Sequence, residues 1–141
     1  MGKKDHGALV IVEDEPLLLE YVESVLQGAG HDTRSAQSLA EAHALVQSLD
    51  SFDLVFTDIV LRDHKYGGVV VGELATERRP GTPVLYTSGT QSPLAATAIG
   101  KFLQKPYRAQ SLLEAVACLL RRKGEWHRTK SSLAPERKSF S

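Results

Sequence analysis

The chain has 141 residues, 42% hydrophobic and 24% charged, a balance typical of one globular domain. It contains no apolar run of about 18 residues and no secretory leader, so the sequence predicts no membrane contact. Cys118 is the only cysteine, which excludes an internal disulfide, and together these features predict a cytoplasmic protein.

Charge is unevenly distributed along the chain. Residues 121–141 carry seven Lys or Arg and two Glu, a net +5, which leaves −5 on residues 1–120 because the whole chain is neutral. The segment after residue 122 shows no hydrophobic periodicity. We therefore expect a folded domain over residues 1–122 and a basic, flexible tail over residues 123–141.

Apolar runs and helical patterns alternate along the first half of the chain. Residues 8–12, ALVIV, predict a buried strand. A helix is expected next, with Pro16 in its first turn and Gly28 or Gly30 at its end. Residues 31–36, HDTRSA, predict a short strand, and Ser38 with Glu41 forms a capping box that opens a second helix.

The second half continues the alternation. Six elements are expected: a strand at 52–57, a helix at about 69–78 after a break at Gly67-Gly68, a strand at 83–88, a short helix at 92–100, a strand at 101–104 and an amphipathic helix at 112–120. Five nearly continuous apolar strands, each followed by a helix, predict a doubly wound α/β fold with a parallel sheet covered on both faces.

Polar residues gather where these predicted strands end. In a doubly wound sheet the site lies beyond the carboxyl ends of the strands, where this chain places Glu13–Glu15, Thr57–Asp58, Thr87–Gly89 and Lys105–Pro106. Clustered carboxylates repel one another, and a divalent cation relieves that repulsion. Oxygen ligands of this kind suit Mg²⁺, and Lys105 adds charge for a bound anion. No glycine-rich phosphate loop is present, so a nucleotide is not expected.

Four motifs carry a resemblance to a known family: VIVEDEP (10–16), LVFTDIVL (54–61), PVLYTSG (83–89) and FLQKPY (102–107). In this order and spacing, the sequence from Ala8 to about Leu120 resembles the receiver domain of two-component response regulators. The resemblance implies a flavodoxin-like (βα)5 fold with strand order 2-1-3-4-5. The segments YTSG and KPY most resemble receivers attached to, or partnered with, hybrid-type histidine kinases.

The resemblance also implies roles for individual residues. Asp58 is expected to accept a phosphoryl group from a phosphohistidine. Asp14, Asp58 and the backbone carbonyl of Val60 are expected to bind Mg²⁺ directly, and Glu13 through water. Thr87 is expected to hydrogen-bond the phosphoryl group, and Lys105 to pair with it.

Two further expectations and one departure complete the resemblance. Phe102 lies three residues before Lys105, at the position of the aromatic switch residue that responds to Thr87. The Lys105–Pro106 bond is expected to be cis. Four residues after Asp58, where the family usually has proline, this chain has Arg62, and the loop from Leu61 to Gly68 looks longer and more charged than usual.

The leading hypothesis is therefore a phosphoacceptor in a phosphorelay that works with a histidine kinase or a histidine phosphotransfer protein. We expect protein contact or onward phosphotransfer as its output, slow autodephosphorylation rather than enzymatic turnover, no nucleic-acid binding by the domain, and a monomer or phosphorylation-dependent dimer. One alternative is a Mg²⁺-dependent phosphohydrolase with an aspartyl nucleophile, but Val60 stands where such enzymes need a second acid. The other is a pseudo-receiver that only binds partners.

Overall fold

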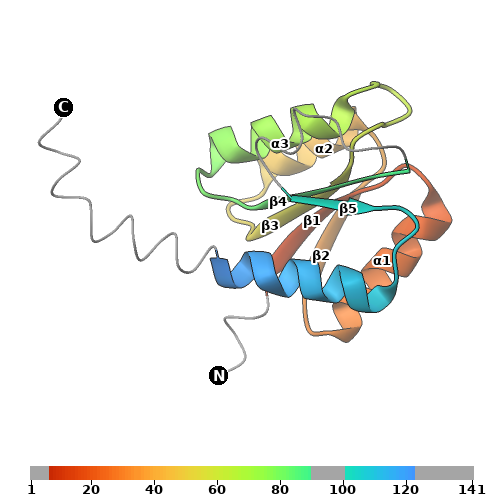
Figure 1. The fold of residues 1–141 in the computed structure, drawn as a ribbon. Helices are drawn as coiled ribbons and strands as arrows, with labels where there is room; N and C mark the ends of the chain where they lie inside the picture. Colours follow the sequence, from red (N-terminus) through yellow and green to blue (C-terminus); the bar gives the residue numbers. More distant parts are fainter. Residues whose placement is uncertain (1–6, 90–100, 123–141) are drawn as a thin grey trace, which may run out of the picture.

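Five parallel strands form a single sheet in the computed structural model, which describes residues 7–89 and 101–122 (Figure 1). The strands are β1 (Ala8–Val12), β2 (Asp32–Ala36), β3 (Leu54–Asp58), β4 (Val84–Ser88) and β5 (Lys101–Gln104). Their spatial order is β2-β1-β3-β4-β5, and all neighbours are parallel. The predicted α/β class and strand order are confirmed.

Helices cover both faces of the sheet. On one face lie α1 (Pro16–Gly28) and a C-terminal helix over residues 109–122; on the other lie α2 (Leu39–Ser48) and α3 (Gly67–Arg78) (Figure 1). The helix expected at 92–100 and the tail expected at 123–141 lie outside the described residues.

The continuous apolar character of β1 follows from this two-sided burial. In β1, Val10 and Val12 belong to the core under α2 and α3, whereas Leu9 and Ile11 belong to the core under α1 and the C-terminal helix. All four are at most 1% exposed. Successive side chains of a strand point to opposite faces, so a central parallel strand needs apolar residues at every position.

Local signals set the ends of the first two helices. Pro16 begins α1, and after its end the amides of Gly30 and His31 donate to the carbonyls of Gln27 and Leu26. Gly30 has φ 97°, so this is the left-handed glycine ending of a Schellman motif. In α2 the Ser38 hydroxyl accepts the Glu41 amide at 3.1 Å, as the capping box predicted.

The predicted start of α3 is wrong by two residues. Gly67 and Gly68 form the first turn of the helix instead of preceding it. The reason is tertiary: a Cβ on Gly68 would lie 1.9 Å from the backbone oxygen of Asp58, so only glycine lets α3 approach the end of β3 this closely. The Gly68 amide donates to the Ile59 carbonyl at 2.8 Å.

A Gly68→Ala substitution tests this close approach. The added methyl meets backbone that has little freedom to move, so we expect a loss of about 3 kcal/mol in the free energy of unfolding, measured by urea denaturation. The matched control is Gly28→Ala in α1, where an added Cβ meets nothing within 4 Å. That control should gain up to about 1 kcal/mol. Equal effects of the two substitutions would contradict the packing described here.

Candidate functional site

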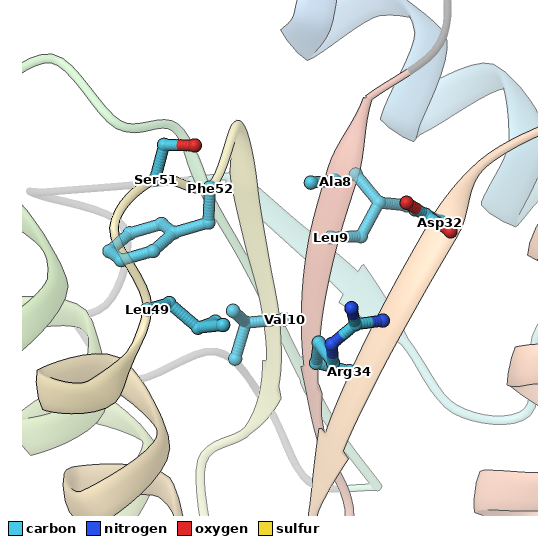
Figure 2. Close-up of a pocket in the computed structure, with 8 residues that line it drawn as sticks. All are labelled: Ala8, Leu9, Val10, Asp32, Arg34, Leu49, Ser51 and Phe52. Atoms are coloured by element: carbon cyan, nitrogen blue, oxygen red, sulfur yellow. The ribbon is translucent and has the colours of Figure 1, made fainter.

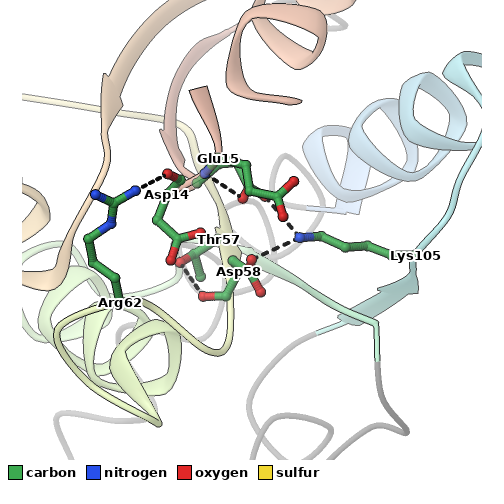
Figure 3. Close-up of polar contacts among 7 residues, drawn as sticks. Asp14, Glu15, Thr57, Asp58, Arg62 and Lys105 are labelled. Carbon is green, nitrogen blue, oxygen red and sulfur yellow. Dashed lines mark hydrogen bonds and ion pairs between the residues drawn. The ribbon is translucent and has the colours of Figure 1, made fainter. Parts of the chain in front are cut away.

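The candidate site lies at the carboxyl ends of the strands, where side chains from different strand ends meet (Figure 3). Glu13 and Asp14 follow β1, Asp58 is the last residue of β3, and Lys105 follows β5. The strand register pairs Asp58 with Thr87 at the end of β4. Residues far apart in the sequence therefore converge on one edge of the sheet, as their positions at strand ends predicted.

Lys105 is the cation that joins two of the acids. Its Nζ lies 2.8 Å from Oδ2 of Asp58 and 3.2 Å from Oε1 of Glu13. Glu13 is 2% exposed and Asp58 is 7% exposed. The Lys105–Pro106 peptide bond, which we expected to be cis, is cis. One ammonium group thus faces two buried carboxylates.

Burial dominates the protonation of these groups. It raises the pKa of Glu13 to about 7, with a further contribution from the charge of Asp58, against the opposing effects of the Glu15 amide and Lys105. Burial also raises the pKa of Asp58, although the hydrogen bond from Lys105 opposes the shift. For Lys105, burial favours a lower pKa, but the bond to Asp58 and the charge of Glu13 outweigh it and raise the pKa. Burial therefore keeps the ionised forms of Glu13 and Asp58 costly even with Lys105 beside them.

A divalent cation fits this donor set. Glu13, Asp14 and Asp58 each offer a carboxylate oxygen, and these oxygens lie within 4.8 Å of one another. Hard oxygen ligands at such spacing suit Mg²⁺, which takes few protein ligands and keeps several waters. A bound cation would also restore the charged forms of the two acids whose pKa values burial raises.

Thr87 also has unused bonding capacity. Its side chain is 1% exposed, and its Oγ1 has no hydrogen-bond partner among the described residues. Leaving a buried hydroxyl without a partner costs about 1–3 kcal/mol. Because Thr87 stands beside Asp58 in the register, its hydroxyl is available to a group attached to Asp58.

Two further site residues were expected from the resemblance. Val60 lies beside the acid cluster, because its backbone hydrogen-bonds the Asp58 carboxylate, and its side chain is 49% exposed. Phe102 is opposite Tyr86 in the register of β4 and β5, and packs partly buried against the core under α2 and α3. Any role of Phe102 is therefore played at a distance from Asp58.

The loop between β3 and α3 supplies two contacts that the sequence did not predict. Nη2 of Arg62 donates to the backbone oxygen of Asp14 at 2.7 Å (Figure 3). The Asp63 carboxylate accepts the amides of Leu39 and Ala40 at 2.9 and 3.1 Å, and these bonds, the Leu39 bond first, hold the pKa of Asp63 below its usual range. No spacing rule points to such contacts, because the partners are 23 to 48 residues apart.

Tyr107 is a further neighbour of the site. The centroids of the Tyr107 and Phe56 rings lie 5.9 Å apart in an edge-on arrangement. Burial, together with the charges of Glu13 and Asp58, raises the pKa of Tyr107. Its hydroxyl is buried without a partner in the part of the chain described. Tyr107 packs, partly buried, against the core under α1 and the C-terminal helix.

A second hollow, of about 70 Å³, lies at the opposite edge of the sheet, beside the first residues of β1 and β2 (Figure 2). Leu49 and Phe52 form part of its wall, and Asp32 and Arg34 are its charged residues. It lacks the converging carboxylates and the half-buried lysine of the first site. The chemistry of this fold therefore concentrates at the carboxyl edge.

Comparisons with known proteins identify the family. A doubly wound α/β sheet with acids and a lysine at its carboxyl edge defines the class. The family model of the response regulator receiver domain matches residues 9–117. The chain belongs to the response regulator receiver domain family.

Individual relatives support the assignment. The chain is 36% identical over 117 residues to the response regulator protein PilR of Pseudomonas aeruginosa, covering 79% of this chain and 26% of that protein. It is 28% identical over 110 residues to the nitrogen assimilation regulatory protein NtrX of Azorhizobium caulinodans, covering 74% and 24%. The chain thus spans about a quarter of the length of these curated relatives.

Solved structures share the fold. A receiver protein from Sinorhizobium medicae superposes with a TM-score of 0.74 at 30% identity, covering 82% of this chain and 95% of that chain. A CheY-like receiver domain protein from Methanospirillum hungatei superposes with a TM-score of 0.76 at 24% identity, covering 84% of this chain and 96% of that chain. Within residues 7–89 and 101–122, no helix combines the length and apolarity needed to cross a membrane.

The raised pKa of Glu13 predicts a pH dependence of stability in the metal-free protein. Between its ordinary pKa of 4.5 and about 7, the folded state holds more protons on Glu13 than the unfolded state does. Its contribution to stability therefore falls as the pH rises through this range. Glu13→Gln removes that titration, so the variant should gain stability relative to wild type between about pH 5 and pH 7.5.

Urea denaturation in the presence of a chelator measures this difference. If the difference in the free energy of unfolding between Glu13→Gln and wild type were the same at about pH 5 and about pH 7.5, the raised pKa of Glu13 would be contradicted. Adding Mg²⁺ should stabilise wild type most at the higher pH, where Glu13 is ionised.

Proposed function

We propose that Asp58 accepts a phosphoryl group from a phosphohistidine on a histidine kinase or a histidine phosphotransfer protein. The observation that carries the proposal is the placement of Lys105 against Asp58 and Glu13, with Asp14 in the same cluster. Membership of the receiver family supplies the context.

The transfer needs a nucleophile, a path for the leaving group and neutralised charge. A carboxylate oxygen of Asp58 attacks phosphorus in line with the phosphorus–nitrogen bond of the donor. The new P–O bond forms as the P–N bond breaks, and the bonding electron pair leaves with the donor imidazole. Catalysis of such transfers is mainly positioning and electrostatic stabilisation, which these fixed strand ends supply.

The residues around Asp58 would have different roles in the transfer. Asp14, Asp58 and the Val60 carbonyl would hold Mg²⁺, and Glu13 would contact it through water. The bound ion would neutralise negative charge on the phosphoryl oxygens. Lys105 is placed to exchange its bond with Oδ2 of Asp58 for a phosphoryl oxygen. Thr87 Oγ1, buried and unpaired in the described residues, is placed to donate to another.

The same hydroxyl would begin the output signal. As Thr87 moves toward the phosphoryl oxygens it vacates space on its own strand, and Phe102 on the neighbouring strand would turn inward to fill that space. Phenylalanine gains no hydrogen bond when exposed, so burial of its ring favours the inward rotamer. The switch is therefore a shift in the populations of two rotamers.

We place this chemistry in the cytoplasm, with protein contact or onward phosphotransfer as the output and slow autodephosphorylation as the reset. The domain itself needs no nucleic acid for these steps. Monomers, or dimers that form on phosphorylation, both suit this mode of signalling.

Phosphorylation of Asp58 is tested with acetyl phosphate and Mg²⁺, followed by intact mass measurement. Wild type should gain one phosphoryl group, and Asp58→Asn should gain none, because the amide keeps the shape but lacks the nucleophilic anion. The matched control is Asp50→Asn, an exposed acid outside the cluster of Glu13, Asp14 and Asp58; it should still be labelled.

Two results would contradict the proposal. Continuous release of phosphate from small phosphate esters would favour the aspartyl phosphohydrolase. No label on wild type from either acetyl phosphate or a phosphorylated histidine protein would favour a pseudo-receiver.

The Phe102 switch is tested by side-chain NMR with Mg²⁺, with and without the phosphoryl mimic beryllium fluoride. The inward rotamer should increase with the mimic, and Thr87→Ala, which lacks the hydroxyl, should show a much smaller change. If Phe102 keeps one rotamer in both states while neighbouring surface signals still shift, the aromatic switch is wrong for this protein.

A further inference from the structure

Arg62 replaces the proline that the family usually has at this position, and the replacement creates a contact that proline could not make. The guanidinium Nη2 reaches the backbone oxygen of Asp14 at 2.7 Å. Arg62 and Asp14 are 48 residues apart. The loop after β3 is thereby attached to the loop after β1, which carries two of the three acids.

Asp63, the next residue, attaches the same loop to a third part of the fold. Its two carboxylate oxygens accept the first amides of α2, from Leu39 at 2.9 Å and from Ala40 at 3.1 Å. Those amides have no partner within the helix, so a carboxylate there is favoured both by hydrogen bonding and by the helix dipole. Ser38 already caps the Glu41 amide, so Asp63 caps the donors that Ser38 leaves free.

The turn that carries Arg62 and Asp63 is held by its own hydrogen bonds. The amide and carbonyl of Leu61 bond the carbonyl and amide of His64 at 3.1 and 3.0 Å, and the Leu61 side chain is 3% exposed. The Tyr66 amide donates to Nδ1 of His64 at 3.0 Å. Because this turn has little conformational freedom, holding Asp63 in place also holds Arg62 in place.

We propose that Arg62 and Asp63 form a clamp that positions Asp14 for Mg²⁺. Asp63 holds the turn against the amino end of α2, and Arg62, projecting from that turn, holds the backbone of Asp14. Both are positioning residues, since neither supplies a carboxylate to the cluster of Glu13, Asp14 and Asp58. The proposal rests on the proposed magnesium site and adds residues particular to this chain.

Charge alone makes a different prediction from a clamp. Removing the positive charge of Arg62 would tighten binding of a cation nearby, and removing the negative charge of Asp63 would weaken it. Loss of the clamp weakens binding in both cases, because both substitutions release Asp14. Both side chains are exposed, so their long-range charge effects are screened at about 0.15 M salt, where the Debye length is about 8 Å.

The test uses Arg62→Met, Arg62→Lys and Asp63→Ala, with Ser38→Ala as the control. Ser38→Ala removes a cap from the same helix without touching the β3–α3 loop. Mg²⁺ affinity is measured by calorimetric titration at about 0.15 M salt. A second measurement needs no metal: hydrogen exchange of the Glu15 amide, which donates to Oε2 of Glu13 at 3.1 Å and reports order in the β1–α1 loop.

Arg62→Met should weaken Mg²⁺ binding about fivefold, the equivalent of one lost hydrogen bond. Asp63→Ala should weaken it about threefold, and the double variant by less than the product of the two changes, because the restraint is shared. Arg62→Lys, which keeps a donor, should lie closer to wild type. Ser38→Ala should lower the melting temperature but leave the affinity unchanged.

In the absence of metal, Glu15 exchange should be faster in Arg62→Met and Asp63→Ala than in wild type or Ser38→Ala. Unchanged exchange in both variants would overturn the clamp, as would an Arg62→Met protein that binds Mg²⁺ as tightly as wild type or more tightly. If wild type binds no Mg²⁺ while exchange follows the expected order, the magnesium site fails and the restraint on the Asp14 loop stands.

Discussion

The ion pairs of Lys105 with Asp58 and Glu13 are the interaction on which the site depends. Burying an unpaired carboxylate costs several kcal/mol, and here two carboxylates are buried next to each other. One lysine at 2.8 and 3.2 Å offsets part of that cost but leaves the pKa of both acids raised. The residual imbalance is what makes the edge receptive to a divalent cation and to a phosphoryl group.

The fold makes that arrangement available by a constraint on the strands. In the parallel order β2-β1-β3-β4-β5, the carboxyl ends of β1, β3, β4 and β5 meet at one edge, so each strand contributes one or two site residues. Gly68 lets α3 approach the Asp58 carbonyl, and Arg62 in the β3–α3 loop donates to the backbone oxygen of Asp14. The end of β3 is therefore packed against α3, and the loop that follows it contacts the loop after β1.

Sequence reasoning succeeded where one residue, or a short spacing, carries the information. Apolar runs identified β1, β3 and β4, Pro16 and Gly30 marked the ends of α1, and Ser38 marked the start of α2. The acids and Lys105 were found because a strand end followed by a polar residue has a known place in a parallel sheet. Thr87 was found at a strand end in the same way and its role came from the resemblance; the structure adds that its hydroxyl lacks a partner among the described residues.

Sequence reasoning failed where the cause is a contact between distant segments. Gly67-Gly68 looked like a helix breaker, yet the pair opens α3, because the space beside the Asp58 carbonyl excludes a side chain. Arg62 appeared only as a departure from the family, and nothing local shows that it reaches the Asp14 carbonyl. Asp63 caps a helix that begins 24 residues earlier in the chain, beyond the range of any capping pattern.

Chemical mapping of the phosphoryl group tests the central claim most directly. After reaction with acetyl phosphate and Mg²⁺, borohydride reduces an acyl phosphate to an alcohol, and peptide mass spectrometry locates the reduced residue. The account predicts a single Mg²⁺-dependent modification, at Asp58, that competes with beryllium fluoride. Modification of Glu13, Asp14 or a histidine in place of Asp58, or labelling indifferent to Mg²⁺, would contradict it.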